Sequence, residues 1–251
     1  MSIIVLADNV IGLEAIKFLK SKNEKIEAIF LHPKEYCNLD QEIIAASELE
    51  ESRIFNIGKN WDEESLTFLQ EVNPDFILAA SWRYILPKEV IKIAKKTCIN
   101  FHLSFLPFNK GKKPNVWPII EGTPAGVSLH EIDENIDTGP VIARKEVIVE
   151  PIDTGRTLYI KLIKTMNQLF KNEWENIKKG NYKLIDQRGL EGTFHLDKDF
   201  AELDLINLDK HYLGRDLINL LRARTFKPYP AAYFMENGRK VYVRVELEYK
   251  K

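Results

Sequence analysis

The sequence predicts an α/β protein, and two observations support this fold class. Short apolar segments rich in Ile, Val and Ala alternate with longer amphipathic segments through the first hundred residues. Turn-forming residues such as Asp8-Asn9 and Asn73-Pro74-Asp75 separate these segments. Strands that alternate with helices indicate a mostly parallel sheet with helices on both faces, as in Rossmann-like folds. The expected strands are 3–7, 26–31, 53–57, 76–80 and 97–104, and the expected helices are 12–19, 41–49, 62–72 and 87–96.

The pattern changes after residue 125. Residues 127–132 and 141–149 are expected to be strands, and 153–179 a long helix. We expect residues 1–181 to form a core domain and 182–251 a small C-terminal unit of a helix and a β-hairpin. In that unit the helix is expected over 213–223, and Asn237-Gly238 between two strand-like segments is a strong hairpin signal.

Composition describes an ordinary globular chain. Hydrophobic residues make up 45% and charged residues 29%. The net charge of −1 gives no sequence-wide reason to expect a nucleic-acid partner, which leaves only a local basic patch as an alternative. The short apolar start lacks a basic flank and reads as a strand rather than a signal peptide, and no apolar run is long enough to span a membrane. Cys37 and Cys98 have neither metal-binding nor redox spacing, so reduced thiols in a cytoplasmic protein are expected.

Three polar side chains alternate along the expected strand 97–104. Asn100, His102 and Ser104 would share one face, because successive side chains of a strand point to opposite sides. Ligands bind at the C-terminal ends of strands in open α/β sheets. Asp137 follows in a turn before Gly139, and a carboxylate there could orient and charge the imidazole of His102. An amide, an imidazole and a carboxylate together suit acyl transfer.

Each of these residues also has a structural interpretation. A single His or Asn at a strand end is more often an ordinary hydrogen-bonded polar group, and Asp before Thr-Gly is a common turn former. His130, in the middle of an expected strand, is interpreted as structural or as a support for the site. The functional interpretation of Asp137 requires its loop to fold back over the Asn100 strand.

The order of motifs around Asn100 resembles the folate-dependent formyltransferases. That family carries Asn-x-His, then Ser-x-Leu-Pro, a basic-Gly segment, Pro-x-x-Trp, a Gly-Val-Ser/Thr-Leu-His strand and Asp-x-x-x-Asp-Thr-Gly. The resemblance is close over residues 74–150 and loose elsewhere. The matching segments here are Asn100-Phe101-His102, Ser104-Phe105-Leu106-Pro107, Lys110-Gly111, Pro114-Asn115-Val116-Trp117, Gly126-Val127-Ser128-Leu129-His130 and Asp133-Glu134-Asn135-Ile136-Asp137-Thr138-Gly139.

The resemblance implies formyl transfer from 10-formyltetrahydrofolate, with Asn100, His102 and Asp137 as catalytic residues and no metal. Asn100 would hydrogen-bond the formyl oxygen, and His102 would move the amine proton. In the family the segment before the Asn-x-His strand wraps the pterin, largely through backbone groups. The resemblance implies folate contacts at Arg83, Tyr84, Ile85, Leu86, Ser104, Leu106, Pro107, Asp133 and Thr138. The expected acceptor contacts are Trp82, Arg83, Lys112, Lys113, Asn115, Trp117 and Tyr229, although Trp82 could equally be a core residue and the lysines a solvated loop.

Length and the C-terminal unit make this chain most like the sugar N-formyltransferases, which act on nucleotide-linked amino sugars for surface polysaccharides such as the O-antigen of lipopolysaccharide. The expected acceptor is dTDP-4-amino-4,6-dideoxyglucose, with the 3-amino isomer or a UDP-sugar left open. A homodimer is expected, because Val241, Val243, Val245 and Leu247 alternate along an apolar face. The alternatives are methionyl-tRNA or another folate-dependent formyltransferase, and a non-catalytic nucleotide-binding α/β module.

Overall fold

The computed structural model describes residues 1–250 of the 251, with the backbone alone at 201 and 202. The chain forms two compact units, each assembled from several segments. Unit 1 contains Met1–His102, Ser128–Arg144 and Met166–Arg188, and unit 2 contains Leu103–Val127, Lys145–Thr165 and Gly189–Lys251. The predicted division into a core domain at 1–181 and a small C-terminal unit at 182–251 stays a prediction.

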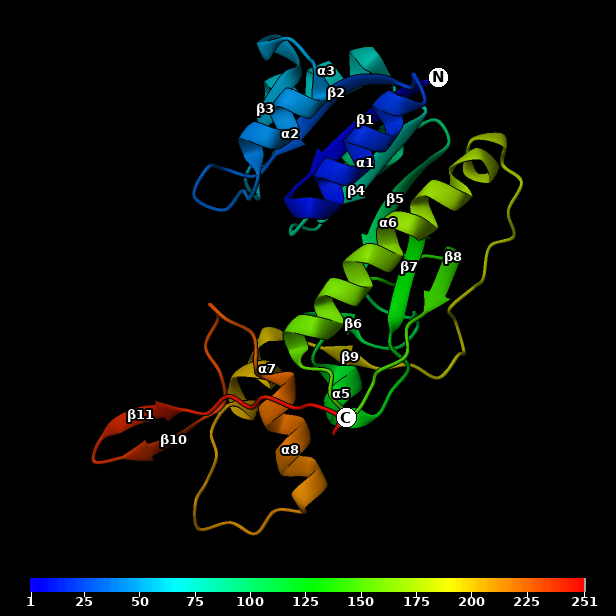
Figure 1. The fold of residues 1–251 in the computed structure, drawn as a ribbon. Helices are drawn as coiled ribbons and strands as arrows, with labels where there is room; N and C mark the ends of the chain where they lie inside the picture. The colour runs from blue at the N-terminus through cyan, green and yellow to red at the C-terminus, as the bar shows by residue number, and fades with distance from the viewer. Residues whose placement is uncertain (251) are drawn as a thin grey trace. The chain divides into compact units, whose positions relative to one another are not determined.

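Unit 1 is built on a seven-stranded sheet with the order β3-β2-β1-β4-β5-β7-β8. Strands β1 to β5 run parallel to one another, and β7 runs antiparallel to β5. The predicted α/β class with a mostly parallel sheet is therefore confirmed (Figure 1). The strands are β1 (Ser2–Ala7), β2 (Lys25–Leu31), β3 (Ile54–Asn56), β4 (Phe76–Ala80), β5 (Thr97–His102), β7 (Gly126–Glu131) and β8 (Val141–Glu146).

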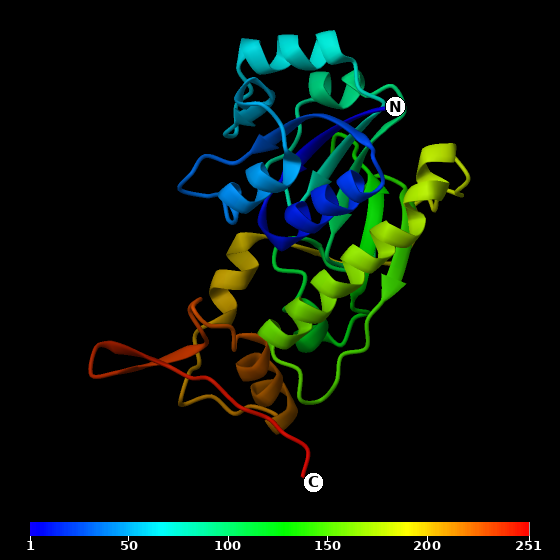
Figure 2. The same ribbon diagram turned by 45° about the horizontal axis from the view of Figure 1, so that its top comes forward.

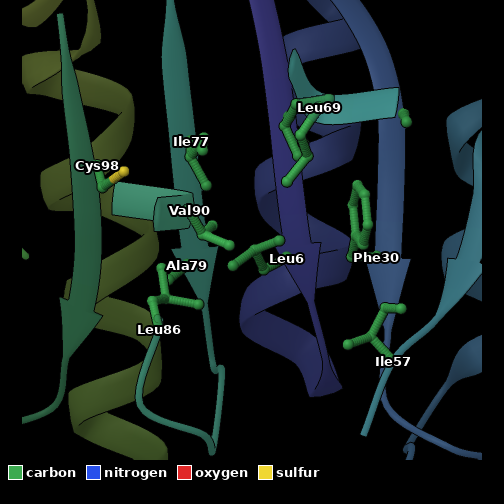
Figure 3. Packing of buried hydrophobic residues seen from close by; sticks show 11 residues of the cluster. Leu6, Phe30, Ile57, Leu69, Ile77, Ala79, Leu86, Val90 and Cys98 are labelled. Carbon is green, nitrogen blue, oxygen red and sulfur yellow. The ribbon is translucent and has the colours of Figure 1, made fainter. Parts of the chain in front are cut away.

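One face of this sheet packs against α3 (Glu63–Val72) and α4 (Lys88–Ile93). Figure 3 shows the buried cluster that results, in which alternate residues of each strand point toward the helices. Burying one such side chain contributes roughly 1.5–3 kcal/mol, so this cluster is a main source of stability. Its labelled members are Leu6, Phe30, Ile57, Leu69, Ile77, Ala79, Leu86, Val90 and Cys98.

The opposite face packs against α1 (Asn9–Ser21) and the part of α6 (Gly155–Lys179) that belongs to unit 1. Aromatic rings make this contact: Phe170 of α6 lies with its ring centroid 4.7 Å from that of Phe101 and 5.5 Å from that of Phe18. In Figures 1 and 2, α1 and α6 lie on the same side of the strands. Helices therefore cover both faces, as predicted. Helix α2 (Asp40–Ser47) and a 3-10 turn at Glu51–Arg53 complete the first half of the unit.

Unit 2 contains short elements around a small apolar cluster. Ile206, Leu220 and Ala232 are buried in it, and Val243 packs against them. The predicted hairpin is confirmed: β10 and β11 pair, and Asn237 and Gly238 between them both have positive φ, at 49° and 73°. The elements are β6 (Lys110–Gly111), α5 (Trp117–Glu121), β9 (Phe194–His195), α7 (Asp197–Leu203), α8 (Gly214–Ala223), β10 (Tyr233–Glu236) and β11 (Arg239–Tyr242).

Several expected elements end early. Strand β5 ends at His102 rather than at residue 104, because its ladder with β4 stops at Asn100 and its ladder with β7 stops at His102. Ser104 therefore lies beyond the strand, and the expectation that it shares the strand face was wrong. Helix α4 ends at Ile93 and β8 at Glu146, so the predictions of 87–96 and 141–149 were too long. None of the helices in residues 1–250 has the length and apolar character that crossing a membrane requires.

Candidate functional site

The site begins at the end of β5. Cys98 lies on the face of the sheet that α4 covers, and its thiol donates to the carbonyl of Ile91 at 3.5 Å. Asn100 and His102 point to the same face, two and four residues further along, because strand side chains alternate. Asn100 is half-buried and His102 is buried. The strand thus carries a polar pair where the apolar core ends, as the alternation predicted.

The side-chain amide of Asn100 connects two other polar residues. Its Nδ2 donates to Oδ1 of Asp137 at 3.2 Å and lies 3.1 Å from Nε2 of His130, which faces Asn100 across the β5–β7 ladder. Nδ1 of His130 is 2.7 Å from the carbonyl oxygen of Glu131, which can only accept. Nδ1 therefore carries the proton, and Nε2 accepts the second hydrogen of the Asn100 amide. This network settles the tautomer of His130 and the orientation of Asn100.

His102 and Asp137 form the second half of the cluster. Nδ1 of His102 lies 3.5 Å from Oδ1 of Asp137, the same oxygen that accepts from Asn100. This distance exceeds that of a strong hydrogen bond, but it keeps the imidazole and the carboxylate in electrostatic contact. The structure thus brings together all three predicted catalytic residues, and it adds His130. The cross-strand position of His130 depends on strand pairing, for which the sequence carries no direct signal.

The Asp137 loop folds back onto the end of β7. Asp133 holds its first half, since its carboxylate accepts from the amide of Asn135 at 3.0 Å and from the hydroxyl of Thr138 at 2.8 Å. Asp137 has a φ of 54°, and the amide of Glu131 donates to the carbonyl of Pro140 at 2.9 Å. A Cβ on Gly139 would lie 1.9 Å from the carbonyl oxygen of Glu131, so this close approach requires glycine. The condition set for Asp137 from the sequence is met.

The segment after β4 lies next to this loop, because Lys88 at the start of α4 forms an ion pair with Glu134. The side chain of Ile85 is 63% exposed, whereas Leu86 is buried in the apolar cluster of Figure 3. Only the backbone of Leu86 is therefore available to a ligand, which fits the backbone-mediated contact implied for this segment. The predicted folate contacts at Asp133 and Thr138 stay predictions, since their side chains bond to each other.

A second cluster, not predicted from the sequence, surrounds His32 just beyond the end of β2. The imidazole is fully buried, and its ring stacks on Trp82 with centroids 4.1 Å apart. The rings of His32 and Tyr84 are perpendicular, with centroids 5.2 Å apart. Burial, reinforced by the positive charge of Arg83, lowers the pKa of His32 to about 4. Asp8 lies 4.0 Å away, and burial disfavours its charged form too, since it raises the pKa of this carboxyl. We therefore treat His32 as neutral and the pair as no salt bridge at neutral pH.

One face of the Trp82 ring packs against His32 in this second cluster. Its indole Nε1 is buried without a hydrogen-bond partner among the described residues. The exposed Arg83 places its guanidinium 5.2 Å from the ring centroid of Tyr36. One face of Trp82 thus packs in the interior, as the core interpretation expects, while the side chain remains partly exposed. Substrate contact by Trp82 and Arg83 stays a prediction.

The other predicted site residues belong to unit 2. Asn115 donates to the carbonyl of Gly155 at 2.9 Å, and the indole of Trp117 donates to the carbonyl of Lys112 at 2.8 Å. Both side chains are buried, which favours a structural role for them. Ser104, Leu106 and Pro107 are buried as well, whereas Lys112, Lys113 and Tyr229 are exposed. Their contacts with folate or acceptor stay predictions.

Metal ligation has no candidate in the part of the chain that the structure describes. No group of three or more His, Cys, Asp or Glu side chains there could hold an ion. The predicted independence from metal stays a prediction. What the cluster offers is a proton acceptor next to a carboxylate, and an amide held by two acceptors.

Comparison with known proteins assigns the two parts of the chain to families. Residues 3–172 match the model described as formyl transferase, and residues 199–249 match the N-formyltransferase dimerization C-terminal domain. The dTDP-4-amino-4,6-dideoxyglucose formyltransferase of Mycobacterium tuberculosis is 37% identical over 152 residues, which are 60% of this chain and 64% of that protein. The match thus spans less than two thirds of that relative. The methionyl-tRNA formyltransferase of Thermodesulfovibrio yellowstonii is 33% identical over 190 residues, 74% of this chain and 59% of that protein.

Solved structures agree. A 4-N formyltransferase from Francisella tularensis is 28% identical and superposes with a TM-score of 0.84 over 99% of this chain and 98% of its own. The formyltransferase PseJ from Anoxybacillus kamchatkensis, solved with UDP-4,6-dideoxy-4-formamido-L-AltNAc and tetrahydrofolate, is 29% identical. It has a TM-score of 0.60 over 80% of this chain and 89% of its own. On the family match over residues 3–172, this chain belongs to the formyl transferase family.

Proposed function

We propose that the protein is a folate-dependent sugar N-formyltransferase, which transfers the formyl group of 10-formyltetrahydrofolate to the amine of a nucleotide-linked amino sugar. The observation that carries the proposal is the cluster at the end of β5, where one Asp137 oxygen lies 3.2 Å from the Asn100 amide and 3.5 Å from His102. The C-terminal family match over residues 199–249 directs the proposal to this branch of the family.

The chemistry assigns one task to each residue. The acceptor nitrogen bonds to the formyl carbon, the bond from that carbon to the folate nitrogen breaks, and one proton passes from the amine to the departing nitrogen. His102 takes up this proton and returns it, and Asp137 stabilises the imidazolium between the two steps. General acid–base catalysis of this kind contributes ~10²–10⁴-fold.

Asn100 would stabilise the negative charge that develops on the formyl oxygen. Both hydrogens of its amide are directed at acceptors, Asp137 and His130. In the reaction the formyl oxygen would take over one of these two hydrogens. A donor aimed at developing charge is worth roughly 2.7–4 kcal/mol. The hydrogen bond to His130 would orient the Asn100 amide before the substrate binds.

The donor would lie along the segment after β4. The exposed Ile85 and the core-anchored Leu86 lie in this segment, next to the Asp137 loop. Backbone donors and acceptors there would suit a flat heterocycle that carries alternating donors and acceptors. Tetrahydrofolate is present in the PseJ complex, whose protein is 29% identical to this chain.

For the acceptor we favour dTDP-4-amino-4,6-dideoxyglucose, which is the substrate named for the relative with 37% identity. The UDP-sugar in the PseJ complex keeps a UDP-linked acceptor open. Methionyl-tRNA is the second candidate, since such an enzyme matches at 33% identity. Against it stand the C-terminal match to a dimerization domain and a net charge of −1. The C-terminal match to a dimerization domain also supports a homodimer. We place the enzyme in the cytoplasm, where nucleotide sugars are synthesised.

A substrate panel tests the proposal. The purified protein is mixed with 10-formyltetrahydrofolate and, in separate reactions, dTDP-4-amino-4,6-dideoxyglucose, its 3-amino isomer, a UDP-linked 4-amino sugar and charged initiator methionyl-tRNA. Product mass and folate absorbance are followed, with His102→Asn as the matched control. We expect formylation of the dTDP-linked 4-amino sugar by the wild-type protein. Formylation of the tRNA alone would move the protein to the translation branch.

A further inference from the structure

Gln187 makes two contacts with the loop that carries Asp137. Its Nε2 donates to the backbone carbonyl of Asp137 at 3.0 Å and to that of Gly139 at 2.6 Å. The side chain is 5% exposed and lies 50 residues further along the chain than Asp137. No motif of the sequence marks this residue.

The position of Gln187 follows from a short antiparallel pairing. Val141, the first residue of β8, and Ile185 exchange two backbone hydrogen bonds of 2.9 Å each. Antiparallel pairing brings residues two before Val141 opposite residues two after Ile185, which are Gly139 and Gln187. The backbone pairing of Val141 with Ile185 thus places the side-chain amide of Gln187 next to the loop.

The two halves of the loop have different supports. In the first half, the Asp133 carboxylate accepts hydrogen bonds from the amide of Asn135 and the hydroxyl of Thr138, both within the loop itself. Gln187 holds the carbonyls on either side of Thr138, where the backbone of Asp137 has a φ of 54°. Few non-glycine residues adopt this conformation, although Asp is among those that tolerate it best, and a contact to the backbone on either side helps to hold it.

We propose that Gln187 is a positioning residue, which fixes the backbone of Asp137 and Gly139 and so directs the Asp137 carboxylate at Asn100 and His102. This role rests on the proposed function, because its purpose is to align the pair that moves the proton. Only the amide NH₂ group serves it: Oε1 of Gln187 is buried without a hydrogen-bond partner among the described residues.

The test replaces Gln187 by a side chain of similar size. Gln187→Met keeps most of the volume and removes both donors, and Asp186→Asn is the matched control, since Asp186 is exposed and its side chain bonds to Arg188. We expect Gln187→Met to lower kcat by up to roughly 100-fold, because small misplacements of catalytic groups have effects of this size. The KM for the nucleotide sugar should change much less. A kcat equal to that of the wild type would overturn the proposal.

The same substitution made in Asp137→Asn protein distinguishes a role in positioning Asp137 from a general loss of folded structure. In Asp137→Asn protein, Gln187→Met should lower kcat little further, because the carboxylate that it positions is already absent. An equal loss in both backgrounds would overturn the proposal, since it would show that Gln187 acts elsewhere. Hydrogen exchange gives a readout independent of activity: amides of residues 134–141 should exchange faster in Gln187→Met than in the wild type. Unchanged exchange would overturn the positioning role of Gln187, whether or not the protein is active. If no amino sugar in the panel is formylated, the proposed function fails, and the exchange measurement still decides the role of Gln187.

Discussion

Two histidines lie at the ends of parallel strands in unit 1, and their surroundings differ. His102, the last residue of β5, lies 3.5 Å from the Asp137 carboxylate in a cluster joined by hydrogen bonds. His32, just after β2, is enclosed by the rings of Trp82 and Tyr84, and neither ring nitrogen has a partner with good hydrogen-bond geometry among the described residues. One cluster is polar and the other is aromatic.

The difference has a chemical consequence. Burial without a partner penalises the charged imidazolium, and this lowers the pKa of His32 to about 4. At His102, by contrast, a carboxylate that accepts a hydrogen bond from Asn100 lies 3.5 Å from the ring. A histidine at a strand end therefore becomes a useful proton acceptor only where a polar network supports it. For this reason we assign proton transfer to His102 and a packing role to His32.

The largest expected effect is on the polar cluster itself. His102→Asn and Asp137→Asn should each lower kcat by ~10²–10⁴-fold, because each removes part of the acid–base pair. Binding of the nucleotide sugar, measured by calorimetry, should change far less, since charge develops only during transfer. Near-normal turnover of either purified, folded variant would remove that residue from the mechanism.

A smaller but broader effect is expected from Gly139→Ala. The added methyl group would overlap the carbonyl oxygen of Glu131, so the loop must move and Asp137 with it. We expect a loss of roughly 1–3 kcal/mol in the free energy of unfolding and a lower kcat. Gly58→Ala is the control, because the nearest atom to its added Cβ would be 3.9 Å away. Denaturant unfolding and turnover measure both effects, and equal behaviour of the two variants would contradict the loop geometry.

The effect expected from the aromatic cluster is confined to acidic pH, where it concerns stability and leaves turnover at neutral pH unchanged. The folded protein binds the proton of His32 less readily than the unfolded chain, since burial lowers this pKa from 6.5 to about 4. The free energy of unfolding should therefore fall as the pH drops from 6.5 to 4, by at most roughly 3 kcal/mol from this group. His32→Phe keeps a ring against Trp82 and removes the titration. Unfolding curves across this range should be less pH-dependent for the variant than for the wild type, and parallel curves would contradict the assignment.

Local patterns in the sequence account for what could be predicted. The alternation at residues 97–104 placed Asn100 and His102 on one face, and Asn237-Gly238 predicted the hairpin between β10 and β11. Ser104 was misplaced because the end of β5 depends on where β4 and β7 end, which is a property of the neighbouring strands.

The contacts that were missed join distant segments. His130 faces Asn100 only because β7 pairs with β5 in one register. Gln187 reaches the Asp137 loop through the pairing of Ile185 with Val141. His32 meets Trp82 because β2 and β4 flank β1 in the sheet order. Strand order and register are set by the whole core, so single-sequence patterns do not reveal these neighbours.

A double-mutant cycle tests most directly whether His102 and Asp137 act as one unit. The kcat for formylation of the nucleotide amino sugar is measured for His102→Asn, Asp137→Asn and the protein that carries both changes. Residues that act together show strongly non-additive losses. Our account predicts that the double variant loses about as much activity as the more damaging single variant. A loss equal to the product of the two single losses would contradict it, because it would mean that the two residues contribute independently.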